Sequence, residues 1–205
     1  MDEKNRTVNI MIETTGEGLI HFYSILQRGF YIHTKTGISI FDFLVETCRI
    51  DPGYITGKIK SIFLNSKPVD DYKKAIVRDG ITLALSGPMP GLVGAVMRAG
   101  SGYSSFRSTI THREEERADI RGMGYVFLKL FNVIMSDLGE KILGSGIVLE
   151  VNEMENFLKY EQPRFWDECK KIFINDGIVQ KDKFKKEGFN SHGVSHVLLR
   201  VKVLP

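Results

Sequence analysis

From Gly80 to Arg113 the chain contains neither aspartate nor glutamate, and glycines interrupt this run at short intervals. Patterns typical of packed strands and helices lie before and after it. Repeated glycine is unfavourable inside either element, so the run favours a connection over another core element. The sequence therefore predicts three parts: a first block at 1–86, a connector or functional loop at 87–122, and a second block at 123–205.

The first block combines strand patterns with two well-marked helix starts. Thr7–Glu13 alternates in polarity, which is typical of a strand with one buried face. Ser39 with Asp42 three residues later predicts a capped helix through Arg49, and Asp51 followed by proline predicts a second helix start. Further strands are predicted at 29–34, 62–64 and 81–85, the last one after an Asp-Gly turn.

The second block also mixes both element types. Strands are predicted at 125–135, 147–151 and 194–203 from their β-branched and aromatic content. Asn152 with Glu155 predicts a helix cap, and a further helix is expected from Pro163. Its apolar face would consist of Phe165, Cys169, Ile172 and Phe173. The predicted fold class is α+β, with a small unit before and after the connector.

The stretch 29–91 resembles the ubiquitin-like β-grasp sulfur carriers, namely the small subunit of molybdopterin synthase and the thiamine sulfur carrier. The similarity lies in the order of strand, capped helix, strand with an Asn-Ser-Lys-Pro turn, Asp-Gly turn, final strand and a Pro/Gly peptide ending at Gly91. It implies a β-grasp fold for the first block and docking to a protein partner. Sulfur transfer in this family uses a terminal glycine carboxylate, whereas here Leu92 follows Gly91 and the chain continues.

Composition narrows the possible functions. The net charge is +3, and a balanced charge of this size predicts no sequence-specific nucleic-acid binding, with weak, salt-sensitive affinity at most. Two cysteines form neither a disulfide framework nor a four-cysteine zinc site, and Cys48 and Cys169 are expected to be small core residues. No secretory pattern follows the N-terminus, and the uncharged run from Gly80 to Met97 is rich in Gly and Pro, so we expect a cytoplasmic protein without a membrane span.

The connector supplies the candidate ligand-binding residues. Backbone N–H groups near Gly100 and Gly102 are suited to cradle an anion, with Arg107 and Arg113 as charged partners. The alternative is a flexible connector without a ligand. Neither a Walker motif nor a dinucleotide-binding glycine motif supports a nucleotide.

His112 is the candidate catalytic residue, acting as a base with Glu114 as its partner. The alternative is a solvated helix start capped by Thr111.

His192 and His196 have the i, i+4 spacing of a helical metal site, but the valines around them favour a strand, on which they would lie too far apart. We therefore predict no metal or cofactor. The lysines around Phe184 indicate a solvated loop or a site for a phosphate backbone.

The connector also carries apolar residues beyond what a pure linker needs: Leu92, Val93, Val96, Met97, Tyr103 and Phe106. We therefore predict that it becomes ordered by packing, and that the chain is a non-catalytic interaction or assembly protein that binds a protein partner or itself. The alternatives are an enzyme or a binder of a small anionic ligand with its site in 87–122, and an RNA-associated module. On this interpretation, aspartate at Val93 and Val96 weakens self-association or stability, whereas alanine at Arg107 and His112 changes little.

Overall fold

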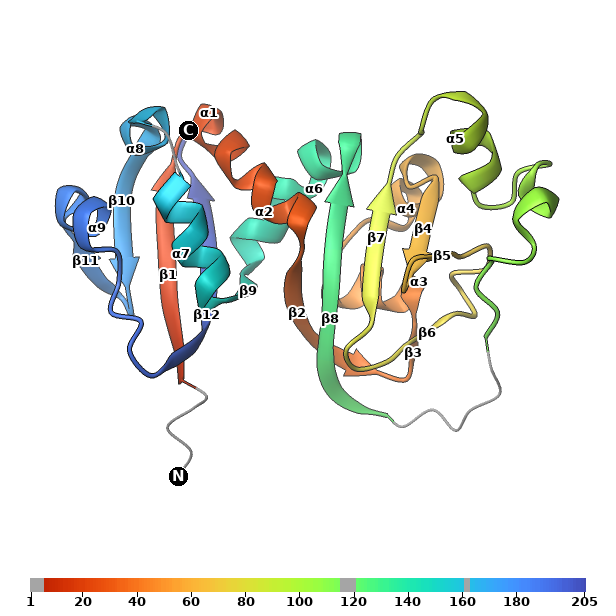
Figure 1. The fold of residues 1–205 in the computed structure, drawn as a ribbon, viewed down its shortest axis with the longest axis horizontal. Coiled ribbons are helices and arrows are strands. Elements are labelled where there is room, and N and C mark those ends of the chain that lie inside the picture. The colour runs from red at the N-terminus through yellow and green to blue at the C-terminus, as the bar shows by residue number, and fades with distance from the viewer. Residues whose placement is uncertain (1–5, 115–120, 161–162) are drawn as a thin grey trace. The chain divides into compact units, whose positions relative to one another are not determined.

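The computed structural model describes residues 6–114, 121–160 and 163–205 (Figure 1). Helices and mixed sheets make up the chain, which confirms the predicted mixture of α and β structure. Contacts divide it into two compact units, Met1–Ile25 with Leu138–Pro205 (unit 1) and Leu26–Asp137 (unit 2). These boundaries differ from those predicted near residues 86 and 123.

The sheet of unit 1 explains why the first strand groups with the end of the chain. Its strand order is β11-β10-β1-β12-β9, in which β1 and β12 are parallel and the other neighbours are antiparallel. The strands are β1 (Arg6–Thr14), β9 (Ile147–Glu150), β10 (Cys169–Ile174), β11 (Gly177–Val179) and β12 (Val194–Val203). Because β1 lies between two strands of the C-terminal half, both of its hydrogen-bonding edges are satisfied there.

The helices of unit 1 contribute a cluster of aromatic side chains to its core. Phe22, Phe157, Phe165, Trp166 and Phe184 are buried and form a chain of ring contacts with centroid separations of 4.9–6.2 Å. The elements are α1 (Gly16–Leu19), η2 (Ile20–Phe22), α7 (Val151–Tyr160), α8 (Pro163–Glu168) and α9 (Lys181–Glu187). The unit boundaries fall within α2 (Tyr23–Arg28) and α6 (Asn132–Ser145).

The main strands of unit 2 follow the order β2-β8-β7-β4-β5. Strands β7 and β8 are parallel, and the other neighbours are antiparallel. The strands are β2 (Phe30–Thr36), β4 (Ser61–Leu64), β5 (Lys67–Pro68), β7 (Thr82–Ser86) and β8 (Gly122–Phe131), and β3 (Ile38–Ser39) pairs separately with β6 (Ile76–Val77). The predicted first block is thus divided between the two units.

One face of the unit 2 sheet is covered by helix. The side chain of Thr34 on β2 lies 2.7 Å from that of Thr47, at the end of the π-helical η3 (Phe43–Thr47), which continues from α3 (Ile40–Asp42). The sheet residues on this face, such as Val126 and Leu128, are fully buried. The opposite face therefore carries the alternate residues of each strand.

The two helix starts predicted in the first block are confirmed. The Ser39 hydroxyl accepts a hydrogen bond from the Asp42 N–H at 3.0 Å. Asp51 caps α4 (Pro52–Lys58), because its carboxylate accepts the Tyr54 N–H at 3.0 Å and proline occupies the first turn.

Three predicted elements in the second block are wrong in detail. The strand predicted to reach Met135 ends at Phe131, because Asn132 adopts a left-handed conformation with φ 47° and opens α6. The helix α7 begins at Val151 directly after β9, so Asn152 lies within it. The helix predicted from Pro163 ends at Glu168, and Cys169 and Ile172 lie on strand β10, where burial of both residues satisfies the same apolar pattern.

Candidate functional site

The predicted connector is folded over all of its described part. Residues 87–114 form α5 (Gly91–Met97) and the 3-10 turn η4 (Ser104–Arg107). Backbone bonds attach this segment to the sheet, with the Ala99 N–H donating to the Lys60 carbonyl at 3.0 Å and the His112 N–H donating to the Pro68 carbonyl at 2.8 Å. The segment is therefore an ordered part of unit 2.

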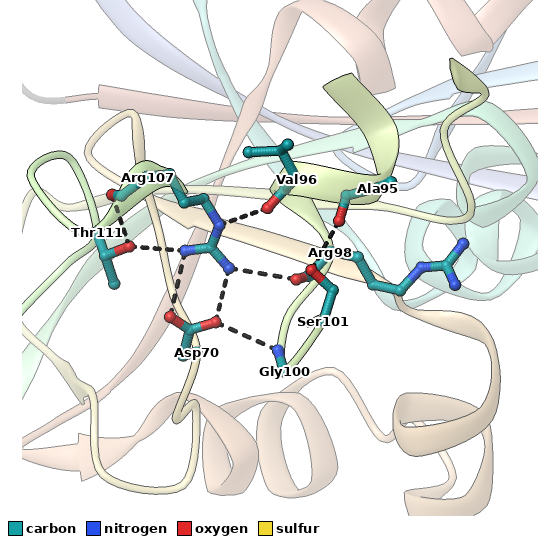
Figure 2. A network of polar contacts seen from close by, with 8 residues as sticks. All are labelled: Asp70, Ala95, Val96, Arg98, Gly100, Ser101, Arg107 and Thr111. Atoms are coloured by element: carbon teal, nitrogen blue, oxygen red, sulfur yellow. Dashed lines mark hydrogen bonds and ion pairs between the residues drawn. The ribbon is translucent and has the colours of Figure 1, made fainter. Parts of the chain in front are cut away.

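Arg107 holds this segment together from the inside (Figure 2). Its side chain is 1% exposed, and its guanidinium binds both carboxylate oxygens of Asp70, at 2.6 and 3.2 Å. The remaining N–H groups donate to the Val96 carbonyl at 2.7 Å, the Thr111 hydroxyl at 2.8 Å and the Arg98 carbonyl at 3.2 Å. A guanidinium has five N–H donors, and each has one acceptor here.

This geometry changes the role of the predicted anion-binding residues. The Gly100 N–H and the Arg107 guanidinium do converge on an anion, but that anion is the Asp70 carboxylate of the same chain. Gly102 lies exposed in a turn, and Arg113 is exposed. Arg107 has no donor left for an external ligand, so its role is to fix the path of the segment.

His112 and Glu114 form the one predicted acid–base pair that the structure brings together. Their side chains are 3.1 Å apart, and the Glu114 carboxylate also accepts the Ile76 N–H at 3.0 Å and pairs with Arg78 at 2.6 Å. Partial burial would raise the pKa of Glu114, but the hydrogen bonds from Ile76, His112 and Arg78 outweigh it and lower the pKa. These contacts fasten residue 114 to β6, which is a structural role.

Because the pKa of Glu114 is lowered by folding, its ionised form contributes stability above the ordinary carboxyl pKa of 4.5, and this contribution is lost as the pH falls through the lower folded-state value. We expect Glu114→Gln to lower the stability at pH 7 by about 1 kcal/mol. The gap between variant and parent should narrow below pH 4.5 in thermal melts recorded across pH.

The matched control is Glu17→Gln, which removes the exposed ion pair with Arg164. It should change stability little at any pH, since exposed pairs contribute little. A difference in stability between Glu114→Gln and the parent that stays constant with pH would contradict the lowered pKa of Glu114.

The segment presents a group of large apolar side chains to solvent. We call the set Leu92, Val93, Tyr103, Phe106 and Ile110 the apolar patch; these side chains are 48–77% exposed. The rings of Tyr103 and Phe106 stack at 6.3 Å. Sequence reasoning identified four of these residues by their apolar character within the carboxylate-free run, but it missed Ile110.

The other predicted clusters do not assemble a reaction centre. His196 lies on β12 beside Ser195, whereas His192 lies in the preceding turn. Within 6–114, 121–160 and 163–205, no three or more His, Cys, Asp or Glu side chains group so as to hold a metal ion. Cys48 is buried, and that burial raises the pKa of its thiol.

The predicted lysine cluster forms the helix α9. Phe184 is buried beneath it, and Lys185 lies over the Trp166 ring at 6.0 Å. With Lys159 and Glu155 this helix borders an open pocket of about 500 Å³ whose charges are mixed. It is thus a solvated helix face with an apolar underside.

Comparison with known proteins gives no relationship: no family model matches the chain, and neither curated proteins nor solved structures match it significantly. In the part of the chain that the structure describes, no helix has both the length and the apolar character needed to cross a membrane.

Proposed function

We propose that this protein is a non-catalytic interaction module that docks a partner protein through the apolar patch. The observation that carries the proposal is that five large apolar side chains are exposed on a segment held by the buried Arg107 network. Exposed apolar groups gathered on one segment mark interaction surfaces. A segment that is already ordered also loses little conformational entropy when it binds.

The charge around the patch indicates what the partner carries. The segment has exposed arginines at Arg98 and Arg113, and no carboxylate occurs between Gly80 and Arg113. A symmetric contact between two copies would bring these arginines near their own counterparts. We therefore propose a partner segment with apolar anchors flanked by aspartate or glutamate, since complementary charge favours that partner.

A β-grasp-like character for unit 2 is part of the proposal. It is supported by the order β2, α3 with η3, β4, β5 and β7, which follows the order that carried the resemblance. Strand β8 comes from beyond this stretch and lies between β2 and β7 in the sheet. The docking segment is then an insertion between two neighbouring strands. Sulfur transfer is not proposed, because Gly91 begins α5 and offers no terminal carboxylate.

The alternative of an anionic-ligand site in the same segment is weakened by the Arg107 geometry. Its guanidinium and the Gly100 N–H are already bonded within the chain. The remaining candidate, His112, has Glu114 as its partner in a contact that anchors the loop.

The test is selection of peptides from a random library on the purified full chain, followed by titration of the selected peptides. We expect them to combine aromatic or aliphatic residues with Asp or Glu. Phe106→Ser should weaken their binding about tenfold or more, which is the usual effect at an interface anchor. Since Phe106 is 77% exposed, the melting temperature of Phe106→Ser should match that of the parent.

Ile178→Ser is the matched control, because Ile178 is 73% exposed on β11, which belongs to unit 1 and not to the segment that carries the patch. It should leave peptide binding unchanged. The proposal fails if the selected peptides bind Phe106→Ser as tightly as the parent. If sedimentation shows a dimer and Phe106→Ser dissociates it, the partner that binds the apolar patch is a second copy of the chain and not an acidic segment.

A further inference from the structure

The face of the unit 2 sheet opposite η3 carries a second set of unusual side chains. In the β2–β8 register Tyr31 is opposite Phe127, and His33 is opposite Tyr125. These four residues, which we call the aromatic stripe, lie two residues apart along each strand and so share one face. Their place opposite the buried Val126 and Leu128 shows that they do not belong to the core.

The stripe is an ordered surface of rings. The Tyr31 and Phe127 rings lie 4.8 Å apart, and those of His33 and Tyr125 lie 5.0 Å apart. Tyr125 is 46% exposed, His33 is exposed, and the other two are half-buried. Residues two apart on a strand are about 6.8 Å apart, so the rings offer successive contact positions along the strands.

The backbone of Tyr125 is fixed by the residues that lead into the neighbouring strand β7. Asp79 accepts the Tyr125 N–H at 2.7 Å, and the Gly80 N–H donates to the Tyr125 carbonyl at 2.8 Å. A Cβ on Gly124 would lie 2.6 Å from Asp79 Oδ1, so the Asp79 carboxylate fills the space on the face opposite the rings. The Asp79 carboxylate therefore does not lie on the face that carries the stripe.

Positive charge lies at both ends of the stripe. Lys35 is two residues after His33 and therefore lies on the same face of β2. Lys129 lies over the Phe127 ring at 5.5 Å. Along β2, β8, β7 and β4 the residues on this face include no carboxylate. On the neighbouring strand β7 the residues opposite Phe127 and Lys129 are the smaller and uncharged Thr82 and Ala84.

We propose that this face binds single-stranded nucleic acid, with bases stacked on Tyr125 and its neighbouring rings and phosphates paired with Lys35 and Lys129. Stacking on exposed aromatic rings of a sheet, with nearby cations for the backbone, is a general way to hold unpaired bases. Such binding tolerates any sequence because every base has a π-face. A duplex offers no free base faces and should bind more weakly.

The test is fluorescence anisotropy of the full chain with labelled twelve-nucleotide oligo-dT and oligo-U, beside a duplex of the same length, at low salt. We expect both single strands to bind better than the duplex. Tyr125→Ala should weaken binding roughly five- to hundredfold, and Tyr125→Phe should restore it because the ring remains. Stronger binding of oligo-U than of oligo-dT would assign RNA as the natural ligand, and the reverse would assign DNA.

Controls separate stacking from general charge. Tyr160→Ala removes an exposed tyrosine from α7 and should bind like the parent. Lys35→Ala should weaken binding and lower the salt dependence by roughly 0.7 in log–log slope, whereas Lys67→Ala on β5 should not. The inference is overturned if Tyr125→Ala binds like the parent, if the duplex binds best, or if Lys67→Ala and Lys35→Ala have equal effects.

Discussion

Phe165→Ala is expected to destabilise unit 1 by about 3–5 kcal/mol, the usual cost of deleting a fully buried phenylalanine ring. Phe165 is 0% exposed, and its ring contacts those of Phe22, Phe157 and Trp166 at 4.9–5.6 Å. Its removal leaves a cavity lined by these three rings and by the imidazole of His21, which lies 5.6 Å from the Phe165 ring. Rigid aromatic neighbours collapse poorly into such a space, so we expect the upper part of this range.

The measurement is urea unfolding followed by tryptophan fluorescence. Trp166 is the one tryptophan of the chain and lies beside Phe165, so it reports on unit 1. Phe106→Ala deletes the same ring from an exposed position and should cost under about 0.5 kcal/mol. Phe165→Leu, at roughly 1–2 kcal/mol, keeps the measurement possible if the alanine variant does not fold. A cost below 1 kcal/mol for Phe165→Ala would contradict the packing described.

Short-range chemistry was readable from the sequence where neighbouring residues determine it. Ser39 and Asp51 cap their helices as predicted, since the capped N–H lies three residues away in each case. The strand at 194–203 was predicted with the bounds of β12, because β-branched residues dominate it. These features depend on local backbone preference, which a single sequence contains.

Long-range pairing was not readable. Strand β1 lies between β10 and β12, so the start of the chain is held by its end, and no local pattern indicates that pairing. The cross-strand stripe depends equally on register: alternation from Met123 to Lys129 predicts a strand, but only the pairing with β2 places His33 beside Tyr125. The limits of the predicted parts at residues 86 and 123 followed composition, which does not report strand pairing.

The candidate site combines a feature that the sequence predicts with a long-range contact that it does not predict. The sequence predicted Arg107 as the charged partner of a bound anion, with a flexible connector as the alternative, and in the structure Arg107 binds a carboxylate of the same chain. The anion is Asp70, 37 residues earlier in the chain, which sequence alone could not distinguish from a ligand. An arginine in a run without carboxylates thus indicates an unsatisfied cation, and the tertiary fold decides whether an internal or an external anion satisfies it.

This reassignment reverses the expectation that alanine at Arg107 changes little. Arg107→Ala removes five hydrogen bonds, including the side-chain donor to the Val96 carbonyl, while the Arg98 carbonyl keeps the Ser101 N–H at 3.3 Å. We expect a loss of about 2–4 kcal/mol, concentrated in residues 87–114, because the bonds connect α5 and η4 to Asp70 and to one another. Arg107→Lys should recover little, since one ammonium cannot reproduce the planar fork.

The readout is limited chymotrypsin digestion, because Tyr103 and Phe106 are exposed side chains on backbone that must unfold locally before cleavage. Cleavage at these two residues should accelerate at least tenfold in Arg107→Ala. Arg98→Ala removes the same charge from the same segment, but the Arg98 side chain points away from the network in Figure 2. It should therefore be cleaved at the parent's rate.

Asp70→Asn separates the ion pair from the rest of the network. It retains an oxygen acceptor for Arg107 but loses the charge, so its cleavage rate should lie between those of the parent and Arg107→Ala. In the double variant that carries both Asp70→Asn and Arg107→Ala, the effects on the cleavage rate should be less than additive, because both changes remove the same contact. Additive effects, or an Arg107→Ala variant cleaved no faster than Arg98→Ala, would mean that the segment is held by its backbone bonds to Lys60 and Pro68 alone. Arg107 would then have no structural role, and the argument against Arg107 as a ligand-binding residue would fail.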